Sequence, residues 1–125
     1  MYIVDSSVWI ALFSDNDVHH VKAVEAIESI DNARITMPYG VILETATVLS
    51  RKESKERANK LVEYVQANPQ ITVTSPFVSE DVRIFLEERN SLSFVDALLK
   101  YLARRGGLVL VSFDVQLLKA LNNAQ

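Results

Sequence analysis

Residues 1–7 of the chain read MYIVDSS, a short apolar run that ends abruptly on the carboxylate of Asp5 and continues into two serines. The run predicts a buried β-strand that carries one acid at its carboxyl end. In an open α/β sheet, ligands bind outside the carboxyl ends of the strands. We therefore start from Asp5 as a candidate functional residue and ask what the rest of the chain places beside it.

The remaining sequence alternates helices with short β-branched or apolar strands. Three further strands are expected at residues 34–37, 71–74 and 108–111, and helices at 7–13, 18–30, 39–50, 54–67, 78–89, 93–104 and 114–121. Alternating elements of this kind predict a parallel sheet with helices on both faces and right-handed crossovers. The expected fold is therefore a three-layer α/β/α domain that spans residues 1–125.

Two details of the helices bear on later sections. In the helix expected from residue 78 to 89, we place Val82, Phe85 and Leu86 on the inward side. In the helix expected from residue 39 to 50, the apolar arc leaves Leu43 on the opposite side, where it is exposed or belongs to a dimer surface. His19 and His20 follow a turn at a helix start, where a capping or surface role is expected ahead of metal binding.

Composition limits the classes of protein to consider. The 125 residues are 49% apolar with only 3 Gly and 3 Pro, which predicts one domain with a real core and no linker. Cysteine is absent, which excludes disulfides, thiolate metal sites and a cysteine nucleophile. We find neither a signal peptide nor an apolar run that could span a bilayer, and we expect a cytoplasmic protein without membrane contact.

Four acids are expected to meet at one edge of the sheet. Asp5 and Asp114 both follow strands, Glu44 lies in the second turn of the helix after the second strand, and Asp96 is near the start of the helix before the last strand. Helices that connect parallel strands run antiparallel to them, so the start of the 93–104 helix lies toward the carboxyl edge. The topology therefore brings the four carboxylates toward one another.

Each acid also has a structural explanation when it is taken alone. Asp5 and Asp114 are natural helix caps, and Glu44 could turn to solvent or pair with Arg51. The sequence from Ser93 to Asp96 fits a capping box, and Lys100 lies one helical turn after Asp96, where the two could form a surface pair. Only the combined placement of the four favours a functional site.

Clustered carboxylates repel one another unless a cation is present. Their hard oxygen atoms suit Mg²⁺ or Mn²⁺, and the chemistry that such a site supports best is metal-assisted hydrolysis of a phosphodiester. The net charge of −3 lacks the basic excess typical of nucleic-acid binders. A metal in an acidic pocket supplies local positive charge, so the composition permits a nucleic-acid substrate without indicating one.

The sequence resembles PIN-domain ribonucleases, and in its size the VapC-type toxins of toxin–antitoxin pairs. The resemblance covers essentially the whole chain and rests on four motifs in order: residues 4–8, the isolated Glu44, residues 92–98 and residues 110–114, which read VDSSV, E, LSFVDAL and LVSFD. It implies a parallel sheet in the order 3-2-1-4-5. We identify four strands, so a fifth would have to be very short, near residues 122–125, or be missing.

The resemblance also implies an activity and a set of roles. It implies Mg²⁺- or Mn²⁺-dependent cleavage of RNA, a homodimer and a protein antitoxin as partner. Asp5 and Asp96 would be the core metal ligands, and Glu44 and Asp114 would complete the pocket directly or through water. The hydroxyls of Ser6 and Ser112 would support them.

Other functions remain open at this point. A PIN nuclease that is not a toxin, or a PIN-like module that binds RNA or protein without catalysis, would show the same motifs. A receiver-type phospho-acceptor module also gathers acids at a parallel sheet edge, but it expects two adjacent acids after the first strand, where this chain has Asp5 followed by Ser6.

Overall fold

The expected order of strands and helices is the order found. The structure, a computed structural model, describes residues 1–122. Its strands are β1 (Tyr2–Val4), β2 (Ile35–Pro38), β3 (Ile71–Thr74) and β4 (Val109–Val111), and its helices are α1 (Ser6–Leu12), α2 (His20–Ile30), α3 (Tyr39–Lys52), α4 (Lys55–Ala67), α5 (Val78–Glu87), α6 (Phe94–Gly106) and α7 (Val115–Asn122). Within this part of the chain, no helix is both long enough and apolar enough to cross a membrane.

The four strands form one parallel sheet in the order β3-β2-β1-β4. Strand β1 lies in the centre, where Tyr2 pairs with Ile35 of β2 on one side and with Val109 of β4 on the other. This confirms the parallel sheet and the order of its first four strands. Asn122 ends α7, and residues 123–125, where a fifth strand was considered, lie outside the described residues.

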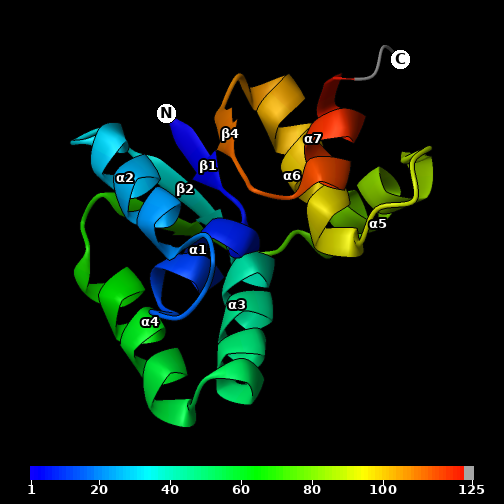
Figure 1. Cartoon of the computed structure of the whole chain (residues 1–125). Helices are drawn as coiled ribbons and strands as arrows, with labels where there is room; N and C mark the ends of the chain where they lie inside the picture. The colour runs from blue at the N-terminus through cyan, green and yellow to red at the C-terminus, as the bar shows by residue number, and fades with distance from the viewer. Residues whose placement is uncertain (123–125) are drawn as a thin grey trace.

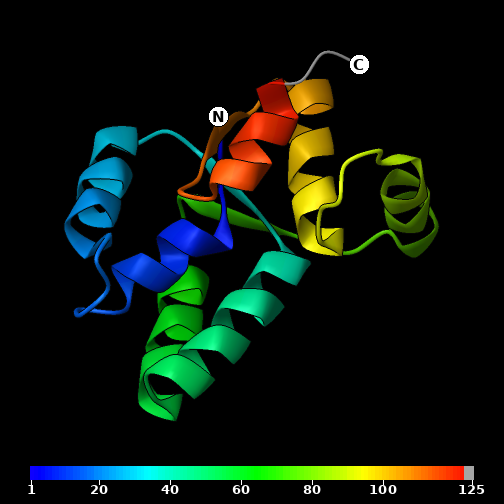
Figure 2. The same ribbon diagram turned by 45° about the vertical axis from the view of Figure 1, so that its right-hand side comes forward.

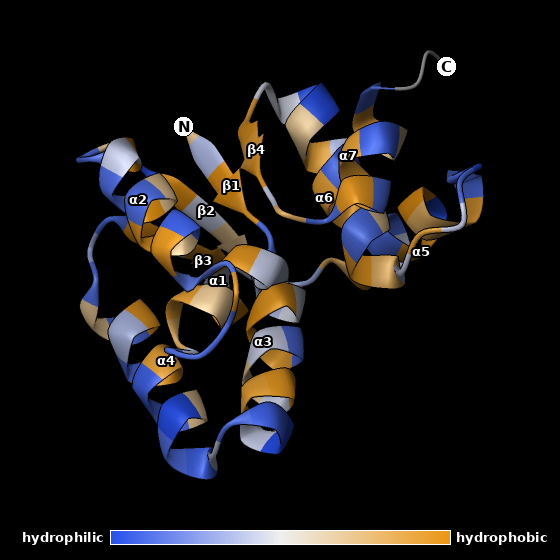
Figure 3. Ribbon diagram, viewed as in Figure 1, coloured by the Kyte–Doolittle hydropathy of each residue, from blue (hydrophilic) through white to orange (hydrophobic). Residues whose placement is uncertain are grey.

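The sheet lies between two groups of helices. Helices α1 to α4 pack together on one side, and α5, α6 and α7 gather on the other (Figures 1 and 2). Apolar residues colour β4 and the carboxyl end of β1 (Figure 3), and Ile3 and Val4 of β1 are fully buried. Trp9 of α1 is also fully buried, and its indole N–H donates to the carbonyl oxygen of Val4 at 3.2 Å. The core thus holds the carboxyl end of β1 in a fixed position.

The prediction for the inward side of α5 is wrong. Ile84 is the buried residue of this helix, whereas Val82, Phe85 and Leu86 are 42%, 39% and 75% exposed. The reason is position: α5 packs against α6 and lies outside it, away from the sheet (Figure 2). One neighbouring helix covers only a narrow stripe, so the rest of the apolar face of α5 stays at the surface.

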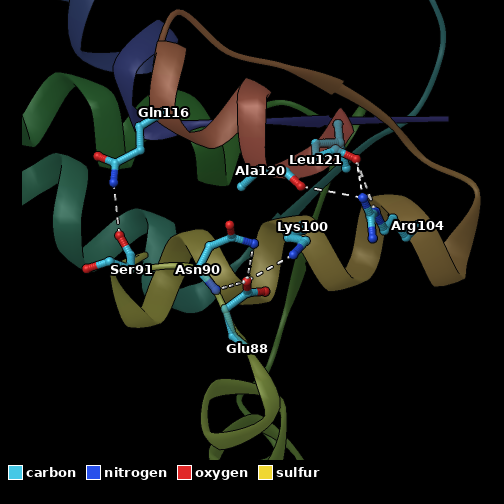
Figure 4. Close-up of polar contacts among 8 residues, drawn as sticks. All are labelled: Glu88, Asn90, Ser91, Lys100, Arg104, Gln116, Ala120 and Leu121. Carbon is cyan, nitrogen blue, oxygen red and sulfur yellow. Dashed lines mark hydrogen bonds and ion pairs between the residues drawn. The ribbon is translucent and has the colours of Figure 1, made fainter. Parts of the chain in front are cut away.

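Lys100 does not pair with Asp96, as the surface-pair interpretation of the sequence would require. Its ammonium lies 2.9 Å from Glu88 Oε2, and both side chains are buried (Figure 4). Asn90 donates to the same oxygen from its backbone and side-chain nitrogens, each at 2.9 Å. Burial alone would raise the pKa of Glu88, but the hydrogen bonds from Lys100 and Asn90 outweigh it and hold this pKa below its usual value. The pair fastens the segment after α5 to α6.

Candidate metal centre at the carboxyl edge of the sheet

Asp5 lies where β1 ends, and its carboxylate points into the site rather than capping α1. Its backbone N–H donates to the carbonyl oxygen of Val111 at 2.9 Å, which continues the pairing of β1 with β4. The side chain is 2% exposed and makes no capping hydrogen bond to α1. Instead, Oδ2 accepts hydrogen bonds from the hydroxyls of Ser7 and Ser112, each at 2.8 Å. The helix-cap explanation of Asp5 therefore does not hold.

Asp96 reaches the same edge from the first turn of α6. Ser93 caps this helix, because its Oγ accepts the backbone N–H of Asp96 at 3.1 Å. The next residues, Ala97 to Lys100, are buried and fix how α6 lies against the rest of the domain. The capping interpretation of this segment is thus confirmed for the backbone, and it is also what positions the Asp96 carboxylate.

Asp114 serves two purposes at once. Its Oδ1 accepts the backbone N–H groups of Gln116 and Leu117 at 2.9 and 3.1 Å, which caps α7. Its own backbone N–H donates to Ser112 Oγ at 2.9 Å. The side chain also contributes an oxygen to the acidic cluster described next, so the structural and the functional interpretations of Asp114 are compatible.

The structure brings three of the four predicted acids together. Asp5, Asp96 and Asp114 each offer one carboxylate oxygen, and these three atoms lie within 4.8 Å of one another. Glu44 is not part of this group. It lies beside it, half-buried on α3, where its Oε2 accepts a hydrogen bond from Ser6 Oγ at 2.8 Å. Within residues 1–122 it forms no ion pair with Arg51.

The cluster carries uncompensated negative charge. Burial, and after it the charges of Asp5, Glu44 and Asp114 in that order, together raise the pKa of Asp96 to about 6, against a smaller opposing effect of the hydrogen bond with Ser93. No lysine or arginine of the described chain forms an ion pair with any of the four acids. Such an arrangement is costly unless protons or a cation neutralise it.

The donor set fits a hard divalent cation. Carboxylate oxygens are the preferred protein ligands of Mg²⁺ and Mn²⁺. In an octahedral complex with bonds of about 2.1 Å, ligand atoms lie between about 3 and 4.2 Å apart. Three oxygens within 4.8 Å of one another need only small side-chain movements to reach these separations. Histidine and cysteine are absent from the cluster, so softer metals that prefer nitrogen or sulfur are disfavoured.

Serine hydroxyls orient the acids, and the sequence analysis identified two of the three. Ser6 and Ser112 were predicted to support the site, and they donate to Glu44 and Asp5. Ser7 was missed. Its hydroxyl donates to Asp5 at 2.8 Å and accepts the backbone N–H of Phe113 at 3.0 Å, so it links β1 to the loop after β4. The signal available in the sequence was that Ser7, a hydroxyl residue, follows the strand-end acid Asp5 by two positions.

Comparison with known proteins agrees with this architecture. The model of the family described as "PIN domain" matches residues 2–121. The structure of VapC20 from Mycobacterium tuberculosis, a toxin that cleaves the sarcin-ricin loop, aligns with a TM-score of 0.84 and 22% identity, covering 96% of this chain and 95% of that one. PAE2754 from Pyrobaculum aerophilum aligns with a TM-score of 0.61 and 24% identity, covering 99% of this chain and 87% of that one. No curated protein matches the sequence.

Proposed function

Because this chain belongs to the PIN domain family, we propose that it is a metal-dependent endoribonuclease that hydrolyses RNA phosphodiester bonds. The observation that carries the proposal is the meeting of Asp5, Asp96 and Asp114 within 4.8 Å at the carboxyl edge of the sheet. Membership of the PIN domain family argues against the receiver-type phospho-acceptor module considered in the sequence analysis. We propose that residues 1–125 form a single PIN-like domain.

The residues have distinct roles in this proposal. Asp5, Asp96 and Asp114 would hold Mg²⁺ or Mn²⁺, with Glu44 completing the site directly or through water. When bound, the metal ion supplies a water of lowered pKa and neutralises charge that develops on the phosphate. Ser7 and Ser112 keep Asp5 in one orientation, and Ser6 does the same for Glu44. Partners of this kind fix ligand geometry and commonly matter nearly as much as the ligands.

The test of the activity is cleavage of a mixed set of single-stranded RNA oligonucleotides. Purified protein is assayed with Mn²⁺, with Mg²⁺ and with EDTA, and Asp96→Asn is assayed in parallel under the three conditions. We expect cleavage with either metal ion, none in EDTA, and none by the variant. Binding of the oligonucleotides without any cleavage would instead support the alternative of a catalytically silent PIN-like module.

We further propose that the protein is the toxin of a toxin–antitoxin pair. The support is a fold that matches VapC20 over nearly the whole of both chains. The discriminating experiment is induced expression in a bacterial host, with and without the small open reading frame that neighbours the gene. Growth arrest that the neighbour relieves supports a toxin with a protein antitoxin. Normal growth with active protein supports a PIN nuclease of another role.

Proton competition at Asp96 gives a second test of the metal centre. Because the pKa of Asp96 is about 6, a cation must displace a proton there at acidic pH. We expect the affinity for Mn²⁺ to fall by about tenfold between pH 7 and pH 5, which is what loss of one proton-linked ligand requires. Titration calorimetry at the two pH values measures the change. Equal affinities would show that Asp96 is not a ligand.

We also propose that the protein forms a homodimer through an apolar groove between α3, α5 and α6. The groove has a volume of about 500 Å³ and includes Tyr39, Leu43 and Phe77, which are 44%, 52% and 68% exposed. Of the exposed residues of α5 that the sequence analysis placed inward, Phe85 adjoins this groove, because its ring stacks on that of Phe94 in the groove wall with centroids 4.9 Å apart. Exposed apolar surface of this kind marks an interaction site.

The dimer is tested by light scattering after size-exclusion chromatography. We expect the wild-type protein to elute as a dimer and Phe77→Glu to elute as a monomer, because a charge would be buried without a partner in the interface. Val18→Glu is the matched control, since Val18 is 90% exposed and lies outside the groove. A monomeric wild type, or a dimeric Phe77→Glu, would contradict the proposed interface.

A further inference from the structure

Two aromatic rings, those of His19 and Phe113, pack against each other in a tilted arrangement, and Phe113 belongs to the loop that carries Asp114 of the carboxylate cluster. The rings of His19 and Phe113 have centroids 5.1 Å apart and planes inclined by 34°. Phe113 immediately precedes Asp114, and its backbone N–H donates to Ser7 Oγ at 3.0 Å, the hydroxyl that also donates to Asp5. Phe113 is therefore connected to Asp5 through the hydroxyl of Ser7 and to Asp114 through one peptide bond.

One backbone hydrogen bond and two ion pairs fix the segment that carries His19. The backbone N–H of His19 donates to Asp17 Oδ1 at 2.8 Å, and Lys52 at the end of α3 pairs with Asp17 Oδ2 at 3.1 Å. The hydrogen bond from His19, together with Lys52, lowers the pKa of Asp17 despite its partial burial. On the far side of the turn, Arg57 of α4 pairs with Asp15 at 2.8 Å. The imidazole is thus presented by a fixed loop.

Within residues 1–122, the side chain of His19 makes a ring contact with Phe113 but no hydrogen bond or ion pair. It stands at the N-cap of α2 but makes no capping hydrogen bond, so the expected capping role is not found. The residue is exposed, whereas Phe113, against which its ring packs, is partly buried. His20, by comparison, is engaged through Nδ1 with the carbonyl oxygen of Ala11 at 2.8 Å.

We propose that the exposed ring of His19, packed against Phe113, forms a platform on which a nucleobase next to the scissile phosphate stacks. Proteins that bind single-stranded RNA hold its splayed bases on aromatic side chains, histidine included, and do so without reading the sequence through hydrogen bonds. Because Phe113 immediately precedes Asp114, a base stacked on this platform would hold the RNA strand while its phosphate lies against the carboxylate cluster. The inference rests on RNA as the substrate and adds a positioning residue to the proposed function.

The test compares binding of two ligands by variants of the full-length protein. All variants carry Asp96→Asn to prevent cleavage, and fluorescence anisotropy reports binding of a labelled single-stranded RNA and of a matched strand with abasic sites. We expect His19→Ala to weaken RNA binding by roughly 5- to 30-fold, His19→Phe to stay within about twofold, and neither to change binding of the abasic strand. Asn16→Ala, an exposed residue of the same loop, is the control and should change neither.

The outcomes separate this inference from the proposed function. Unchanged RNA binding by His19→Ala overturns the platform, and so does an equal loss for the RNA and the abasic strand, which would indicate a charge or folding effect. In the active background, His19→Ala should raise KM with little change in kcat. If the wild-type protein fails to cleave RNA with Mn²⁺ while binding still depends on His19, the platform stands and the ribonuclease proposal fails.

Discussion

Asp5→Asn is expected to lower the rate of RNA cleavage by roughly 10³-fold or more, because in the proposed mechanism the metal ion would contribute several kcal/mol to the reaction and Asp5 would be its most buried ligand. Asparagine keeps the shape and can still accept hydrogen bonds from Ser7 and Ser112, so the fold should persist. The measurement is the initial rate with saturating Mn²⁺ on a fluorogenic RNA. Thermal unfolding of the metal-free variant confirms that it is folded.

Asp31→Asn is the matched control for this variant. It makes the same change of charge at an exposed turn after α2, where the backbone φ of 57° suits asparagine. We expect its rate to equal that of the wild type. If Asp5→Asn kept more than a tenth of the wild-type rate with a normal fold, Asp5 would not be a metal ligand in the reaction.

Lys100→Met is expected to destabilise the protein by about 3–5 kcal/mol, because it leaves the buried carboxylate of Glu88 without its cation. The double variant Lys100→Met with Glu88→Met should recover most of this loss, since a buried ion pair is often replaceable by apolar residues of similar size. Urea unfolding of the metal-free proteins measures both. The segment between α5 and α6 would be the part released.

The surface provides the control for this experiment. Arg83 pairs with Glu80 and Glu87 on the exposed face of α5, and Arg83→Met should cost less than about 1 kcal/mol. A loss below 1 kcal/mol for Lys100→Met as well would show that the buried pair does not stabilise the fold.

The pH dependence of stability gives an independent check on the same pair. The folded pKa of Glu88 lies below its ordinary value of 4.5, so its contribution to stability is complete above pH 4.5 and is lost as the pH falls through the folded pKa. Lys100→Met should lack this acid-side loss. An identical acid-side profile for the two proteins would assign the lowered pKa to Asn90 alone.

The sequence predicted those features of the fold that local pattern and chain direction determine. Four short apolar runs separated by helices require a parallel sheet, and parallel strands place the residues after β1 and β4 at one edge. For that reason Asp5 and Asp114 could be predicted to meet. Asp96 followed from the direction of α6, and its capping serine marked where that helix begins.

Features that depend on packing between distant segments could not be predicted. Which side of α5 is buried depends on whether it meets the sheet or only α6, and its periodicity is the same in both cases. The partner of Lys100 lies twelve residues away across a loop rather than one helical turn away at Asp96. The hydrogen bonds of Ser7 depend on how close the loop after β4 comes to the end of β1, and this distance cannot be predicted from the sequence.

The position of Glu44 lies between these cases. Helix direction correctly brought it near the other acids, but the geometry puts it beside the three-carboxylate group, bonded to Ser6. Its distance from the group depends on how α3 leaves β2 and packs against α1. The proposed mechanism therefore accommodates two arrangements for Glu44, which are direct binding of the metal ion and binding through a water molecule.

The central proposal is that Asp5, Asp96 and Asp114 would hold a divalent cation, which would supply the activated water for hydrolysis of the RNA phosphodiester. Its most direct test is the chemistry of the newly formed RNA ends at early times, with Mn²⁺ and H₂¹⁸O as solvent. Attack by water puts one ¹⁸O into a terminal phosphate, leaves no 2′,3′-cyclic phosphate and stops when EDTA is added. Cyclic phosphate ends without ¹⁸O, or cleavage that continues in EDTA, would contradict the claim.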